Sequence, residues 1–173
     1  MPVSVRDIVE QFATRLAADA TVAEINPTTV AVVDTPSPEL TDRRLFVQVV
    51  PGRTVMQDKD ALTNFAEVTI DAVVFLRVNL DQNTTMRRGI SGNDSPGESV
   101  LELAHSVART MRGSYLGSTL LTPLRLASVS AVTAQPNALQ PGTMRATVSF
   151  DALADIDLRF TPTQNDGTGA EVV

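Results

Sequence analysis

Two long segments of the chain alternate between apolar and polar side chains. In residues 144–160 every even position is apolar, and most odd positions are polar or charged. A side-chain period of two describes an extended strand with one buried face and one wet face. Because strands usually contain five or six residues, a strand of this length must bend across a sheet or project beyond the domain.

The second alternating segment covers residues 64–80, from Asn64 to Leu80. Its even positions from Ala66 to Leu80 are apolar, whereas most of its odd positions are polar. Val73 and Phe75 interrupt the polar series with apolar side chains. This interruption indicates that a helix or a neighbouring chain covers part of the second face.

The N-terminal segment has the pattern of an amphipathic helix. Ser4 followed by Asp7 predicts a capping box, and the helix is expected to fade near Asp19 or Ala20. Apolar residues then recur at helical spacing, which predicts one buried side. This stripe consists of Val5, Ile8, Val9, Phe12, Ala13 and Leu16.

A second helix is predicted after a long polar loop at residues 81–97. Ser95 is its expected cap, with Pro96 in the first turn and Glu98 three residues after the cap. Gly113 is a suitable residue to stop the helix. The expected apolar stripe consists of Val100, Leu101, Ala104, Val107, Ala108 and Met111.

Three shorter β-rich segments complete the pattern. Residues 28–33 predict a short strand, residues 45–50 predict a strand that Pro51-Gly52 stops, and residues 124–133 predict another. Residues 53–63 are polar and are expected to connect elements.

The element order of helix, strands, helix and strands predicts an α+β fold. We expect a mainly antiparallel sheet with long strands, an N-terminal helix and one central helix packed on the sheet. A single domain is expected over residues 1–160. Residues 161–173 lack periodicity and predict a flexible C-terminal tail.

Composition narrows the function classes. The 173 residues carry a formal net charge of −6 and include no Cys. An acidic chain is a poor general binder of phosphate backbones, and the absence of Cys excludes thiolate chemistry and disulfides. No secretory signal and no membrane-length apolar run is recognised, so we expect a soluble protein made in a cytoplasm.

Candidate catalytic residues are sparse. His105, the only His, lies off the apolar stripe of its helix, where an exposed structural role is the simpler interpretation. Asp155 with Asp157, and Asp58 with Asp60, are close carboxylate pairs without further ligands nearby. No phosphate-binding glycine motif is present. We therefore expect no catalytic residue, no bound cofactor and no metal site.

Arginine pairs are the most concentrated positive sites. Arg87-Arg88 lies in the loop at 81–97, and Arg43-Arg44 precedes a predicted strand. Either pair could meet carboxylates of a partner or a DNA backbone, and a solvated loop is the simpler interpretation.

Four segments together resemble tailed-bacteriophage tail terminator and tail-completion (neck) proteins. Residues 43–51 resemble the early strand ending in Val-Val-Pro of that family, and residues 65–75 resemble the strand that follows it. Residues 98–112 are similar to its central helix, and residues 144–160 to its closing strand. The likeness spans roughly residues 1–160, and it is one of layout and short apolar motifs.

This resemblance implies a non-enzymatic structural protein of the virion, assembled in the host cytoplasm. A tail terminator caps the tail tube and joins it to the head connector, usually as a homo-hexamer ring. The implied partners are the tail tube protein and the head-tail connector or head-completion protein. DNA would pass through the lumen without specific binding.

A ring requires contact between different patches of adjacent copies. An acidic lumen would repel DNA. The candidate interface residues are Val73, Phe75, Arg87 and Arg88, and the candidate lumen-facing residues are Asp151, Asp155 and Asp157. The alternatives are a neck or head-closure protein or another virion component, a small ligand-binding domain or enzyme, and a cellular adaptor.

Overall fold

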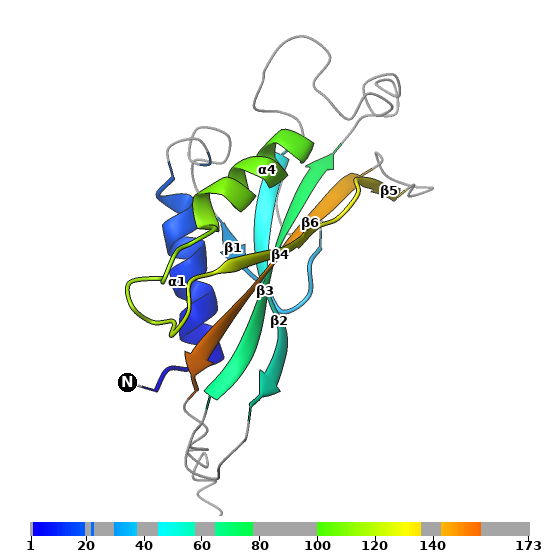
Figure 1. The fold of residues 1–173 in the computed structure, drawn as a ribbon. Helices are drawn as coiled ribbons and strands as arrows, with labels where there is room; N and C mark the ends of the chain where they lie inside the picture. The colour runs from blue at the N-terminus through cyan, green and yellow to red at the C-terminus, as the bar shows by residue number, and fades with distance from the viewer. Residues whose placement is uncertain are drawn as a thin grey trace, which may run out of the picture.

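The computed structural model describes seven stretches of the chain and shows two helices on one face of a six-stranded sheet (Figure 1). The described residues are 2–19, 22, 30–37, 45–57, 65–77, 100–135 and 143–156. The elements are α1 (Val5–Ala17), β1 (Ala31–Val32), β2 (Leu45–Met56), β3 (Phe65–Arg77), α4 (Val100–Met111), β4 (Arg125–Val129), β5 (Thr133–Gln135) and β6 (Thr143–Asp155). The expected α+β class is confirmed. The tail expected at 161–173 lies outside the described residues.

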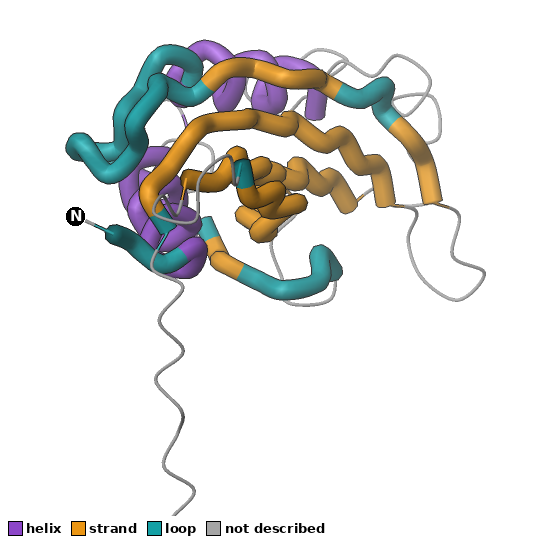
Figure 2. The backbone as a smooth tube through the Cα atoms, turned by 60° about the horizontal axis from the view of Figure 1, so that its bottom comes forward, coloured by secondary structure: helices purple, strands orange, loops and turns teal. Residues whose placement is uncertain are grey.

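The sheet has the strand order β1-β2-β3-β6-β4, and β5 also pairs with β6. All of these pairs are antiparallel except β1 with β2, which is parallel. Figure 2 shows the strands as one curved layer. The expectation of a mainly antiparallel sheet with long strands is therefore confirmed.

The two alternating segments of the sequence pair with each other at the centre of the sheet. Strands β3 and β6 have 13 residues each and run antiparallel from Phe65↔Asp155 to Arg77↔Thr143 without a register shift. In this register the even-numbered apolar residues of both strands lie on the same face. That face is buried beneath α1 and α4, so the period-two pattern becomes one side of the core.

The main core lies between this face and the two helices. Phe12 of α1 and Phe150 of β6 are both fully buried, and their ring centroids are 5.5 Å apart at a tilted angle. Such a tilted arrangement avoids the unfavourable face-to-face contact of aromatic quadrupoles. The predicted stripe of α1 is confirmed, since Ile8, Phe12 and Leu16 are each 0% exposed.

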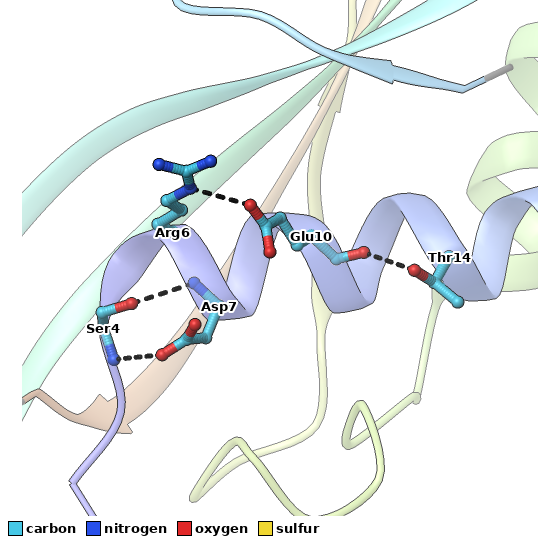
Figure 3. A network of polar contacts seen from close by, with 5 residues as sticks. All are labelled: Ser4, Arg6, Asp7, Glu10 and Thr14. Atoms are coloured by element: carbon cyan, nitrogen blue, oxygen red, sulfur yellow. Dashed lines mark hydrogen bonds and ion pairs between the residues drawn. The ribbon is translucent and has the colours of Figure 1, made fainter.

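Helix α1 begins with the predicted capping box (Figure 3). The backbone N–H of Asp7 donates to the Ser4 hydroxyl at 3.0 Å, and the Ser4 N–H donates to the Asp7 carboxylate at 3.2 Å. These bonds satisfy two N–H groups at the helix start that have no partner within the helix. Arg6 and Glu10 add an exposed ion pair of 2.7 Å one turn apart.

Helix α4 differs from the prediction at one position of its stripe. Leu103 is fully buried, whereas Leu101 is 37% exposed. The remaining stripe residues are buried as expected. The helix ends at Met111, and Gly113 follows with a φ of 81°, which confirms its role as a stop. The expected start signals Ser95, Pro96 and Glu98 lie outside the described residues.

The prediction that Pro51-Gly52 ends a strand is wrong. Strand β2 continues to Met56, with a bulge between Pro51 and Thr54. The N–H of Val33 donates to the carbonyl of Val49, so the backbone polar groups of Val49 face β1 and not β3. Alternate residues of a strand face the same neighbour, so the backbone of Pro51 also faces away from β3. A proline is tolerated there because its missing N–H removes no bond to β3.

The bulge also explains the glycine at position 52. A Cβ at Gly52 would lie 2.8 Å from the carbonyl oxygen of Thr69, which is too close for any side chain. Glycine therefore allows the two backbones to approach at the bulge.

The remaining bounds differ modestly from the sequence expectation. The segment predicted as one strand over 124–133 is two, β4 and β5, with another shift at Leu126/Ser128. The strand predicted at 28–33 is the two-residue β1. The strand predicted over 64–80 is described as Phe65–Arg77, and the strand predicted over 144–160 as Thr143–Asp155; residues 78–80 and 157–160 lie outside the described part.

We expect the capping box to make stability depend on acidic pH. Hydrogen bonding from the Ser4 side chain and then from the Ser4 backbone lowers the pKa of Asp7 below its ordinary value. A lowered folded-state pKa stabilises the fold above the unfolded pKa of about 3.9, and this contribution is lost as the pH falls through the folded value. Asp7→Asn should therefore melt at a lower temperature than wild type at neutral pH.

This difference in melting temperature should shrink as the pH is lowered below about 4. Circular dichroism melts across this range check the prediction. Glu10→Gln is the matched control, because its carboxylate lies on the same helix outside the capping box. A difference that does not change with pH would contradict the assignment.

Candidate functional site

The face of the sheet opposite the helices is divided into an apolar half and a polar half. We call the polar half the open face. Its side chains come from three strands and lie at alternate positions, as the pleat requires. The polar side chains of the open face are Glu67, Thr69 and Asp71 on β3, Ser149, Asp151 and Asp155 on β6, and Arg125 and Ser128 on β4. Phe65 on β3 and Leu153 on β6 are apolar side chains of the same face.

Cross-strand hydroxyl groups hold two carboxylates of the open face. The Thr69 hydroxyl donates to Asp151 at 2.8 Å, and the Ser149 hydroxyl donates to Asp71 at 2.6 Å. In the β3–β6 register each carboxylate lies opposite a hydroxyl, never opposite the other carboxylate. This arrangement avoids the repulsion that like charges directly across a strand pair would produce.

An ion pair extends the open face onto β4. The guanidinium of Arg125 lies 3.4 Å from the carboxylate of Glu67, and the two side chains are 70% and 37% exposed, respectively. Exposed pairs of this kind contribute little to stability, about 0–1 kcal/mol. Together with Asp71, Asp151 and Asp155, Glu67 leaves this surface dominated by carboxylates.

The structure places Val73 and Phe75 inside the chain. Each is 1% exposed, and they form a second, smaller core with Phe46 and Val50, against which Val33 packs. The rings of Phe46 and Phe75 stack with centroids 5.1 Å apart. The apolar interruption of the polar series therefore has an intrachain cover. A subunit contact through these two side chains would require that cover to move away.

Gln48 holds the backbone of Ser37 by hydrogen bonds, and sequence reasoning did not identify this residue. Its side chain is 1% exposed and makes two hydrogen bonds to the backbone of Ser37. The Ser37 N–H donates to Oε1 at 2.9 Å, and Nε2 donates to the Ser37 carbonyl at 2.7 Å. A buried amide needs such partners. A lone Gln inside the apolar run of residues 45–50 was the available signal.

The other predicted site residues have different outcomes. Asp151 and Asp155 lie together on the open face, while their proposed partner Asp157 lies outside the described residues. Arg87 and Arg88, the pair Arg43-Arg44 and the pair Asp58 with Asp60 also lie outside the described residues.

Few arrangements in the described part of the chain suit catalysis. Among those residues, no three His, Cys, Asp or Glu side chains lie close enough to hold a metal ion. His105 is exposed on α4, as its position off the stripe predicted. None of the described helices is long and apolar enough to span a membrane.

Comparisons with known proteins give a structural likeness and no sequence relative. A scan of protein-family models gives no match, and a search of curated proteins gives no relative. Among solved structures, the chain is similar to one in the "Virion of native gene transfer agent (GTA) particle". The sequence identity is 17%, the TM-score is 0.46, and the match covers 86% of this chain and 96% of that one.

Two phenylalanines of β3 provide a matched test of the division of this face into an apolar half, which contains Phe75, and an open half, which contains Phe65. Phe75→Ala should lower the free energy of unfolding by about 3–5 kcal/mol, because it leaves a cavity in the smaller core. Phe65→Ala, on the same strand face but 37% exposed, should cost about 1 kcal/mol or less. Urea unfolding of both variants measures the difference. Equal losses would contradict the division of this face.

Proposed function

We propose that this protein is a non-enzymatic structural component of a virion, and that it works as a tail terminator ring. In this role it caps the tail tube and joins it to the head connector. The observation that carries the proposal is the open face, a hydrogen-bonded acidic surface on a sheet whose other face is buried by helices. The resemblance of four sequence segments to tail terminator and tail-completion proteins supplies the particular role.

The open face suits the lining of a passage for DNA. Several copies around an axis, each presenting Glu67, Asp71, Asp151 and Asp155 inward, would form a wall of negative potential. Such a wall repels the phosphate backbone and offers few cations to replace its counterions. Duplex DNA would then pass without adhering. The helices α1 and α4 would lie on the outside of the ring.

The bonding of the carboxylates fits a passive wall. Asp71 and Asp151 each accept a hydroxyl from the adjacent strand. The cross-strand arrangement keeps these two carboxylates out of direct opposition and partly solvated, which suits a fixed negative surface.

The proposal predicts that the protein is retained in purified particles. Mass spectrometry of virions purified from the source of this gene should detect it at a few copies per particle. Particles made without the gene should contain heads and tails that fail to join. Intact, infectious particles that lack the protein would exclude the role.

Charge reversal on the open face tests the lumen assignment. The double variant Asp151→Lys with Asp155→Lys should gain salt-dependent affinity for duplex DNA, about tenfold or more at low ionic strength. Glu10→Lys with Glu102→Lys, on the helices, is the matched control with the same change in net charge. Fluorescence anisotropy with labelled duplex DNA on assembled protein measures both. Equal affinities for the two variants would remove the open face from the passage.

A further inference from the structure

The two outer edges of the sheet have complementary features. One edge is β4, which no described strand covers on its outer side. The other is the C-terminal half of β2, because β1 pairs with only Gln48 and Val49. Exposed strand edges carry unpaired N–H and C=O groups that readily accept another strand.

The hydrogen bonds inside the sheet identify which backbone groups face outward. The N–H of Gln57 donates to the carbonyl of Phe65, so Gln57 and Val55 face β3, while Thr54 and Met56 face away from it. Alternate residues of an antiparallel strand bond to the same neighbour.

The same argument applies to β4. The N–H of Ser130 donates to the carbonyl of Thr147, so Ser130 and Ser128 face β6. Val129 lies between them, and its N–H and C=O face outward, beyond the register shift at Leu126/Ser128.

Strand direction favours joining these two unlike edges. The order β2, β3, β6, β4 alternates in direction, so β2 and β4 at the two ends run in opposite directions. When a second copy continues the sheet head to tail, its β2 edge lies antiparallel to β4 of the first. Antiparallel pairing is the slightly more stable arrangement.

The faces of the two edges also match. Val129 is paired with Val148, and Thr54 with Val68, and all four side chains lie on the helix-covered side of the sheet. Residues directly opposite in a strand pair share a face, so the sheet can continue with helices on one side and the open face on the other.

Exposed apolar side chains flank the junction. Leu126 on β4 is 37% exposed, and Val32 on β1 is 40% exposed. Both lie on the helix-covered side, at opposite edges of the same sheet. Head-to-tail joining would bring these side chains toward the adjacent copy, where they would lose contact with water.

We infer that the outer edge of β4 binds the edge of β2 around Thr54–Met56 on a second copy of this chain. The contact is antiparallel strand addition, and it makes the open faces of successive copies continuous. This inference rests on the proposed function in so far as a ring uses the contact. The partner is the same chain, and the interface is heterologous, so each copy has one donor edge and one acceptor edge.

Proline substitutions at outward-facing positions test this contact. Val129→Pro and Thr54→Pro each remove an outward N–H without removing a bond within the subunit. We expect each variant to remain monomeric at concentrations at which wild type assembles. Val129→Ala and Thr54→Val keep the N–H and should assemble. Light scattering after size-exclusion chromatography measures the mass of each.

Mixing the two proline variants identifies the edges that meet. Val129→Pro retains the β2 edge and Thr54→Pro retains the β4 edge, so an equimolar mixture should form heterodimers and nothing larger. Thr54→Pro dimerising by itself would indicate a symmetric contact of β4 with β4 and would overturn the inference. Proline variants that assemble like wild type, or a wild-type chain that stays monomeric at about 1 mM, would also overturn it.

Amide hydrogen exchange on wild type provides a test that does not depend on the folding of the variants. The N–H groups of Thr54, Met56 and Val129 should exchange slowly in the assembly and rapidly in dilute monomer. Equally rapid exchange in both would overturn the inference. A protein that pairs by these edges but is absent from particles would refute only the virion role, whereas a protein found in particles without edge pairing would refute only this contact.

Discussion

The pairing of β3 with β6 is the constraint on which the rest of the structure depends. The two 13-residue strands stay in register from end to end. A slip of one residue would turn the apolar side chains of one strand toward solvent and its carboxylates into the core. Because α1 and α4 both pack on the apolar face, that register also determines where the helices lie and which side chains remain exposed.

The same register divides the second face. Toward one end, Phe75 and Val73 meet Phe46 and Val50 beneath a short segment whose backbone is bound by Gln48. Toward the other end, carboxylates alternate with hydroxyl groups across the strand pair. The apolar half stabilises the chain itself, whereas the polar half stays at least partly exposed to solvent.

The chemistry available on the open face fits a structural role. Asp71 and Asp151 each accept a hydrogen bond from a hydroxyl on the adjacent strand, and Glu67 is paired with Arg125. A surface with fixed negative charge excludes polyanions without binding them. Carried on a sheet with unlike edges that match in direction and face, this surface can be repeated by addition of further copies.

Much of the fold could be predicted from local patterns. The capping box at Ser4, the apolar stripe of α1, the stop at Gly113 and the two long strands depend on residues close in sequence. A period of two in a strand and helical spacing in a helix each indicate which side of the element is buried, and the structure buries that side. Leu101 was wrongly assigned to the stripe of α4. Leu101 and Leu103 are both apolar, and only the packing of the helix on the sheet decides which of them is buried.

The sequence by itself determined which side chains alternate. It therefore predicted long strands in a sheet with one buried face and one solvent-exposed face that carries acidic residues. Tertiary structure alone decided that Val73 and Phe75 are covered within the chain, that β2 passes through Pro51-Gly52, and that Gln48 binds Ser37. The physical reason is that burial, a bulge and a long-range hydrogen bond each require a partner from another part of the chain. No local pattern specifies which segment will arrive there.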